Sequence, residues 1–155
     1  MLNPEVSNLY KALVDPEMAT LARCRALERS GSFPIGDGDL SVVLVDDSMI
    51  AGVHAEFMSD SSPTDVITFQ ADREMESAGE IIISVDHARN RANELDLPFS
   101  RELTLYLIHG WLHLAGYDDC TEADREAMRA AEVRALTLVD QDKSCIPYSL
   151  QTTVT

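Results

Sequence analysis

The clearest hydrophobic pattern in the chain is a run of β-branched residues at Glu80–Val85 (EIIISV). Near-continuous isoleucine and valine is typical of a strand that is buried on both faces. Shorter runs at Leu40–Val45 (LSVVLV) and Val66–Phe69 (VITF) predict two more strands. Turn-forming residues precede both of these strands, at 31–39 and at 60–63.

Apolar residues at helical spacing predict two helices that flank these strands. The first covers Pro4–Ser30, where Pro16 either breaks the helix or starts a new one at its first turn. The second covers Asp86–Leu95, and Asp86 is a suitable N-terminal cap for it.

Two further helices are expected in the last third of the chain. One runs over residues 101–115, with Ser100 as its cap and Gly116 at its end. Its residues are apolar almost all round, so it must be central and buried. The other follows Thr121, which with the acid three residues later resembles a capping box, and it ends near Val139.

This order, with helices before and after a small mixed sheet, favours an α+β fold. The 155 residues are enough for one domain with a sizeable core. We expect residues 1–139 to form that single domain. Residues 140–155 show no periodicity, so we expect a flexible C-terminal tail.

The net charge of −15 is distributed unevenly. Residues 1–34 have four acids and four bases, whereas residues 35–86 have twelve acids and one arginine, a net charge of −11. Residues 87–101 carry +1 and residues 102–155 carry −5. A generally basic surface that tracks nucleic-acid phosphates is excluded, but a small local nucleic-acid site is not.

Several other protein classes are disfavoured. The N-terminus lacks the basic and apolar segments of a signal peptide, and the longest uncharged run, Leu103–Tyr117, is too short for a transmembrane helix. Three widely spaced cysteines do not form a disulfide framework. These features together favour a cytoplasmic protein.

The segment HGWLHLAGYDD carries the strongest chemical signal. His109 and His113 are four residues apart, so both imidazoles leave the same face of the buried helix. Gly116 allows the chain to double back, which brings Asp119 within reach as a third ligand. Three protein ligands with one open position are typical of catalytic zinc, although two core histidines bonded internally remain the alternative.

Zinc peptidases share this spacing, but they place a glutamate directly after the first histidine as general base. Gly110 occupies that position here. Because glycine has no side chain to move a proton, a peptidase of that mechanism is disfavoured.

HGWLHLAGYDD resembles the HGxLHLxGYDH signature of the YbeY-type endoribonucleases. Pro63–Phe69 (PTDVITF) resembles the PTDVLSF block of that family, and Gly79–Ile81 resembles its GDI strand start. Met128 and Glu132 fit the helix that follows the signature. The matching blocks run in family order over about two-thirds of the chain.

The resemblance implies an α+β, zincin-like fold whose buried helix carries the HxxxH pair. It implies one zinc ion held by His109, His113 and Asp119, with residues 1–139 as the catalytic domain. It further implies metal-dependent cleavage of single-stranded RNA in 16S rRNA maturation and ribosome quality control. The expected partners are ribosomal RNA, the small ribosomal subunit and ribosome-associated proteins.

Two departures from the family pattern bear on activity. The third ligand of the family is normally histidine, whereas this chain has Asp119, with Asp118 and Cys120 as rival ligands. An aspartate ligand should make the ion a weaker Lewis acid. The family usually keeps an arginine in a Tyr-Arg pair where this chain has Phe57-Met58.

An arginine at that position would suit a scissile phosphate, so its absence leaves three interpretations open. Another arginine substitutes and the protein is an RNase, or the protein is a non-cleaving ribosome-assembly factor. The third is a metallohydrolase that acts on a substrate other than RNA.

The remaining polar candidates are expected to be mainly structural. We expect His54 to lie on a surface or strand, His87 to be solvated, and Asp65 to stabilise a turn. The only basic clusters available to contact RNA are Arg23, Arg25 and Arg29, and Arg89, Arg91 and Arg101.

Overall fold

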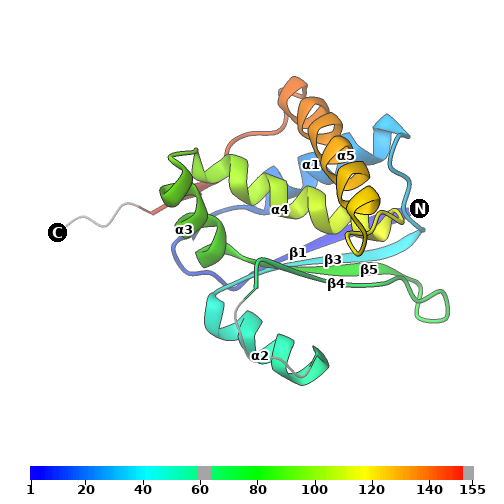
Figure 1. The fold of residues 1–155 in the computed structure, drawn as a ribbon, viewed down its shortest axis with the longest axis horizontal. Coiled ribbons are helices and arrows are strands. Elements are labelled where there is room, and N and C mark those ends of the chain that lie inside the picture. Colours follow the sequence, from blue (N-terminus) through cyan, green and yellow to red (C-terminus); the bar gives the residue numbers. More distant parts are fainter. Residues whose placement is uncertain (59–63, 152–155) are drawn as a thin grey trace.

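The computed structural model describes residues 1–58 and 64–151. A four-stranded sheet has the strand order β1-β3-β5-β4, and only β4 runs antiparallel to its neighbour. Helices α1, α4 and α5 lie on one face of the sheet and α2 on the other (Figure 1). The elements are β1 (Leu2–Asn8), β2 (Leu13–Val14), α1 (Glu17–Ser30), β3 (Gly38–Val45), α2 (Asp47–Met58), β4 (Val66–Phe69), β5 (Ser77–Ser84), α3 (Val85–Leu95), α4 (Phe99–Leu114), α5 (Glu122–Gln141) and β6 (Ser149–Leu150).

The α+β fold is confirmed, as are the three strands predicted from β-branched runs. Strand β5 is buried on both faces, as its composition indicates. Ile81 and Ile83 belong to the large core under α4, whereas Ile82 packs with Ile50 and Ile67 on the α2 side. Asp60–Pro63, expected to be a loop, lies outside the described residues.

The expected helix over Pro4–Ser30 is wrong in its first half. Residues 2–8 form β1, parallel to β3, and the helix begins only after Pro16. The burial of β1 alternates residue by residue, which is the period of a strand with one solvated face. Pro4 has no N–H group to donate, and β1 tolerates it because this strand lies at the edge of the sheet.

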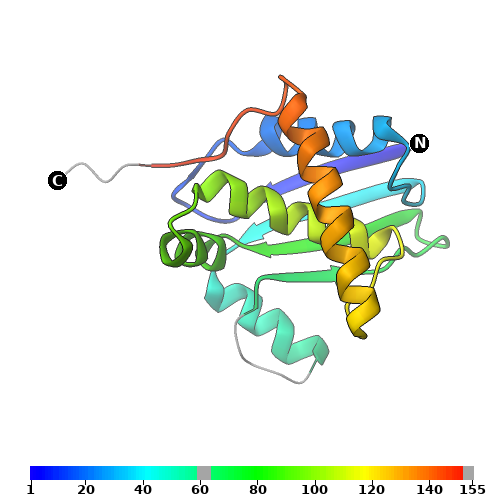
Figure 2. The ribbon, with the colours of Figure 1, turned by 45° about the horizontal axis from the view of Figure 1, so that its top comes forward.

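Helix α4 packs closely against β5. A Cβ atom added at Gly110 would lie 2.5 Å from Ile81 Cγ2, and one at Gly79 would lie 2.6 Å from Leu114 Cδ2. Helix α5 crosses over α4 on the outer side (Figure 2). The C-terminal half of α4 is therefore held between a strand and a second helix.

Of the three N-terminal caps predicted from the sequence, one is found at the expected residue. Thr121 caps α5 by accepting the Asp124 N–H, as predicted. The cap of α3 is Ser84 rather than Asp86. Ser100 lies inside α4, and its hydroxyl accepts the Tyr148 N–H instead of capping the helix.

The segment after residue 139 is more ordered than we expected. Helix α5 continues to Gln141, and β6 pairs antiparallel with β2. The Tyr148 side chain is buried, with its hydroxyl 2.6 Å from Thr20 Oγ1. Residues 140–151 therefore do not behave as a loose tail.

In the described part of the chain, no helix combines the length and the apolar character needed to cross a bilayer.

Candidate metal centre

His109 and His113 lie one turn apart near the C-terminal end of α4. Their Nε2 atoms are 3.1 Å apart, and the two rings meet edge to face with centroids 4.7 Å apart. Both side chains are partly open to solvent, with exposed fractions of 25% and 21%. The pair thus presents two nitrogen donors to one accessible point.

A tight reversal follows the histidines. The Tyr117 N–H donates to the Leu112 carbonyl and the Gly116 N–H donates to the His113 carbonyl, which together form a Schellman motif. Gly116 has a φ of 101°, in the region that favours glycine. This turn sends the chain back along the helix end and brings Asp119 to the histidines, as the sequence indicates.

The Asp119 carboxylate completes a group of three donors. Asp119 Oδ2 lies 3.5 Å from His113 Nε2 and 3.7 Å from His109 Nε2. Donor atoms of a tetrahedral zinc site, each about 2.0–2.2 Å from the ion, are separated by about 3.3–3.6 Å. The three measured separations bracket that range, so these residues can hold a metal ion.

Asp118 and Cys120, the rival third ligands, form a separate exposed group with Asp119. Asp118 Oδ1 accepts the Asp119 N–H at 2.8 Å and the Cys120 thiol at 3.3 Å. The hydrogen bond from the Asp119 N–H lowers the pKa of Asp118 most, and the hydrogen bond from the Cys120 thiol lowers it further. The Asp118 carboxylate in turn raises the pKa of Cys120. Both side chains are therefore engaged within the loop, and neither is grouped with the histidines.

Glu132 of α5 supports the first histidine. Its Oε2 lies 3.0 Å from His109 Nδ1, and only 16% of its side chain is exposed. Burial by itself would lower the pKa of His109, but the hydrogen bond and charge of Glu132, with Asp65 and Asp119, raise it above its usual value. A proton on Nδ1 leaves the Nε2 lone pair for an ion, the usual arrangement of a metal-binding histidine and its carboxylate partner.

The sequence alone assigns no role to Glu132 and shows only that it fits a helix of the family. Its distance of 23 residues from His109 gives no local signal, because the contact depends on how α5 crosses α4. The glutamate becomes recognisable as a positioning residue only when that crossing is known.

The other polar candidates are not grouped with the three donors. His87 is half-buried, with Nδ1 2.8 Å from the Tyr106 hydroxyl, so the expectation of a solvated residue is wrong. His54 is half-buried on α2, a helix and not the expected strand. Asp65 accepts the Val66 N–H, which agrees with a structural role at the start of β4.

The position of Phe57-Met58 is the C-terminal end of α2. The Phe57 ring is 61% exposed and meets Phe69 edge to face, with centroids 5.1 Å apart. A different arginine lies close to the donors: Arg125 Nη1 donates to the carbonyl oxygens of Asp119 and Cys120.

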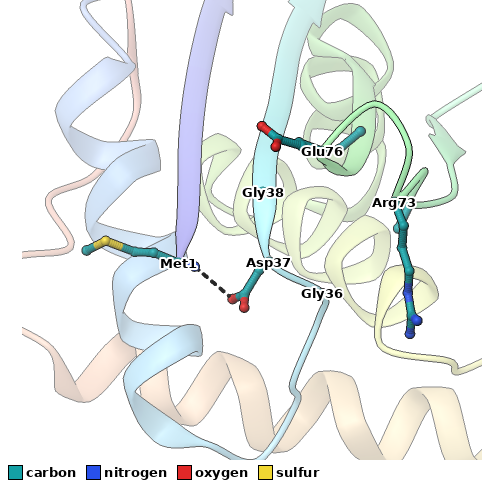
Figure 3. Close-up of a pocket in the computed structure, with 8 residues that line it drawn as sticks. Met1, Gly36, Asp37, Gly38, Arg73 and Glu76 are labelled. Atoms are coloured by element: carbon teal, nitrogen blue, oxygen red, sulfur yellow. Dashed lines mark ion pairs between the residues drawn. The ribbon is translucent and has the colours of Figure 1, made fainter.

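A cavity of about 760 Å³ opens beside the start of β1 and β3. Met1, Asp37, Arg73 and Glu76 line it, and the Met1 amino group pairs with Asp37 at 3.2 Å (Figure 3). The Arg73 and Glu76 side chains point away from each other in this view. The charges of its lining balance, and none of the three donor residues lines it.

Comparison with known proteins gives a consistent result. A family model described as Endoribonuclease YbeY matches residues 8–140. Endoribonuclease YbeY of Heliobacterium modesticaldum is 36% identical over 124 residues, covering 71% of this chain and 74% of the relative. Endoribonuclease YbeY of Sinorhizobium fredii is 32% identical over 138 residues, covering 85% and 78%. The solution structure of TM1509 from Thermotoga maritima matches with a TM-score of 0.61 at 25% identity, covering 93% and 95%.

Proposed function

This chain belongs to the YbeY endoribonuclease family, and we propose that it is a zinc-dependent endoribonuclease acting on single-stranded RNA. The proposal extends to maturation of 16S rRNA and ribosome quality control, with the small ribosomal subunit as partner. A cytoplasmic location is part of the proposal, and the three free cysteines favour it.

The observation that carries the proposal is the group of His109, His113 and Asp119, with Glu132 behind it. The donor set, two imidazoles and one carboxylate, suits zinc. A zinc ion bound there would supply Lewis-acid polarisation of a phosphate oxygen and activation of water.

The side chains of this protein set how that ion would be presented. Glu132 fixes the tautomer and orientation of His109, so that the two Nε2 atoms converge. Asp119 adds a negative charge where the family usually has a neutral imidazole, which should weaken the ion as an acid. Gly110 has no side chain that could transfer a proton, and the close approach of β5 leaves no room for one.

We assign the positive charge near the scissile phosphate to Arg125. Its Nη1 atom donates hydrogen bonds to the carbonyl oxygens of Asp119 and Cys120, at 3.3 and 3.4 Å. These bonds fix the guanidinium beside the loop that carries Asp119. Arg125 is exposed, and its remaining N–H groups have no acceptor among the described residues. A guanidinium so placed matches phosphate oxygens and offsets charge that develops on them.

The test is cleavage of single-stranded rRNA fragments by the purified chain. We expect cleavage that a chelator abolishes and added zinc restores, and that His113→Ala eliminates. His54→Ala is the matched control, because His54 lies on α2 outside the donor group, and it should cleave like the wild type.

RNA binding without metal-dependent cleavage would contradict the nuclease proposal. It would favour a ribosome-assembly factor that keeps the fold, for which Met58 in place of the family's arginine is the supporting observation. Hydrolysis of a peptide with no effect on RNA would favour the third interpretation.

A further inference from the structure

Arg23 of α1 is an arginine buried in an unusual way. Only 3% of the residue is exposed. Its Nε donates to Thr104 Oγ1, its Nη1 donates to the Ala19 and Ile146 carbonyl oxygens, and its guanidinium stacks over the Tyr148 ring at 4.5 Å. All of these partners are electrically neutral.

The positive charge of Arg23 therefore lacks a counter-charge. Within residues 1–58 and 64–151, no carboxylate oxygen lies within 4.0 Å of its guanidinium. Burying a cation without an anion is costly, and buried charges in proteins are normally paired. Tying α4 and residue 146 to α1 accounts for Nε and Nη1 but not for the isolated charge.

The second terminal nitrogen of Arg23 has no protein acceptor. No hydrogen bond from Nη2 occurs among the described residues, yet no fully enclosed side-chain nitrogen or oxygen there lacks a partner. Nη2 is therefore not fully enclosed by the protein. Arg23 also lines a groove of about 360 Å³, so a buried cation with spare donors borders an open space.

The groove lies at the amino end of α4, between that helix, α5 and the segment before β6. Arg101 contributes a second cation, and the Ser100 hydroxyl has a proton to donate because its oxygen accepts the Tyr148 N–H. The first turn of this 16-residue helix adds the positive end of its dipole. Asp140 is the opposing charge in the lining.

We propose that this groove binds a phosphate group, with Arg23 as the buried anchor and Arg101 as the exposed second cation. A guanidinium with free N–H groups, a hydroxyl donor and a helix amino end are the groups that recognise phosphate oxygens. The groove lies at the opposite end of α4 from His113, about 20 Å away along the helix. It is thus distinct from the metal centre. The phosphate is either a free phosphate monoester or part of an RNA backbone.

Binding of inorganic phosphate to the full-length chain tests the proposal, by calorimetry at constant ionic strength. Arg101→Gln should weaken binding about two- to fivefold, and Asp140→Asn should tighten it by a similar factor. Arg25→Gln and Glu126→Gln make the same charge changes at exposed positions outside the groove and should have no effect. Arg23→Gln should abolish binding.

A gain of affinity in Asp140→Asn cannot result from misfolding, so the test stands even if Arg23→Gln is unstable. Each titration is done with zinc and with a chelator, because phosphate can also bind an ion at the metal centre. The Arg101→Gln and Asp140→Asn shifts should persist in both. Equal affinities for the wild type, Arg101→Gln and Asp140→Asn would overturn the proposal.

Short single-stranded oligoribonucleotides distinguish the two sources of phosphate. If the groove takes an RNA backbone, oligonucleotides with a 5′-hydroxyl bind with the same dependence on Arg101 and Asp140. If it takes a free monoester, only inorganic phosphate and 5′-phosphorylated oligonucleotides show that dependence.

Discussion

Replacing Glu132 by glutamine should weaken zinc binding at the metal centre by about 10- to 100-fold. Glutamine keeps the size of the side chain and an oxygen that can accept the His109 Nδ1 proton, but it removes the negative charge. The substitution therefore tests the charge of the partner and leaves the three donors in place.

The structure sets the expected size of the effect. The hydrogen bond from His109 to Glu132 is 3.0 Å long, and both side chains are largely enclosed, with 25% and 16% exposed. A hydrogen bond to a charged group in such a setting is worth about 1.5–3 kcal/mol. Since about 1.4 kcal/mol corresponds to a factor of ten in affinity, the expected loss is about 10- to 100-fold.

The same pair makes the stability of the metal-free protein depend on pH. Burial alone would lower the pKa of His109, but the hydrogen bond and charge of Glu132, together with the charges of Asp65 and Asp119, raise this pKa in the folded state. The pair therefore stabilises the fold fully below the unfolded pKa of about 6.5, and this contribution is lost as pH rises through the folded pKa. The free energy of unfolding should be higher for the wild type than for Glu132→Gln. This difference should be largest at acidic pH and should shrink as the pH rises above the folded pKa of His109.

The assays are zinc competition with a chromophoric chelator, urea unfolding with chelator across this pH range, and histidine titration by NMR. Glu126→Gln, on the exposed side of the same helix, is the control for the loss of one negative charge. Wild-type zinc affinity together with an unchanged His109 pKa in Glu132→Gln would refute the role assigned to Glu132.

Three further predictions concern the metal centre and the helix that carries it. Asp119→Ala should lose bound metal while Asp118→Ala retains it, by metal analysis of the purified proteins, and equal contents would contradict the ligand assignment. Arg125→Gln should slow RNA cleavage about tenfold with metal content unchanged. An unaltered rate would remove Arg125 from the reaction. Gly110→Ala should lower the free energy of unfolding by about 1–3 kcal/mol, because the new Cβ would lie 2.5 Å from Ile81 Cγ2. Urea unfolding measures this, and no loss of stability would mean that α4 lifts from β5 at little cost.

Local patterns were sufficient to predict the part of the chain that carries the donors. The spacing of His109 and His113, the glycine at 116 and Asp119 lie within eleven residues. Helix periodicity and turn chemistry act over that range, so the predicted geometry required no knowledge of the rest of the fold. Strand β5 was equally accessible, because burial on both faces leaves an unbroken run of isoleucines.

The features that the sequence did not predict depend on distant contacts. Residues 2–8 become a strand because β3 offers them a parallel edge, and Pro4 conceals this by weakening the strand signal. His87 is partly covered because Tyr106 of the next helix lies beside it. Arg23, expected among the exposed basic residues, is buried because residues 146–148 fold over it.

The three donors of the metal centre differ in how firmly they are held. His109 and His113 belong to a helix that closely approaches β5 at Gly79 and Gly110. Asp119 is 49% exposed, on a loop that Arg125 holds through two carbonyl oxygens. We therefore expect an ion to be bound and released in steps. Asp119 would be the first donor to detach on release and the last to coordinate on binding. On this basis all three donors contribute to the equilibrium affinity, whereas the opening rate of the loop sets the residence time of the ion.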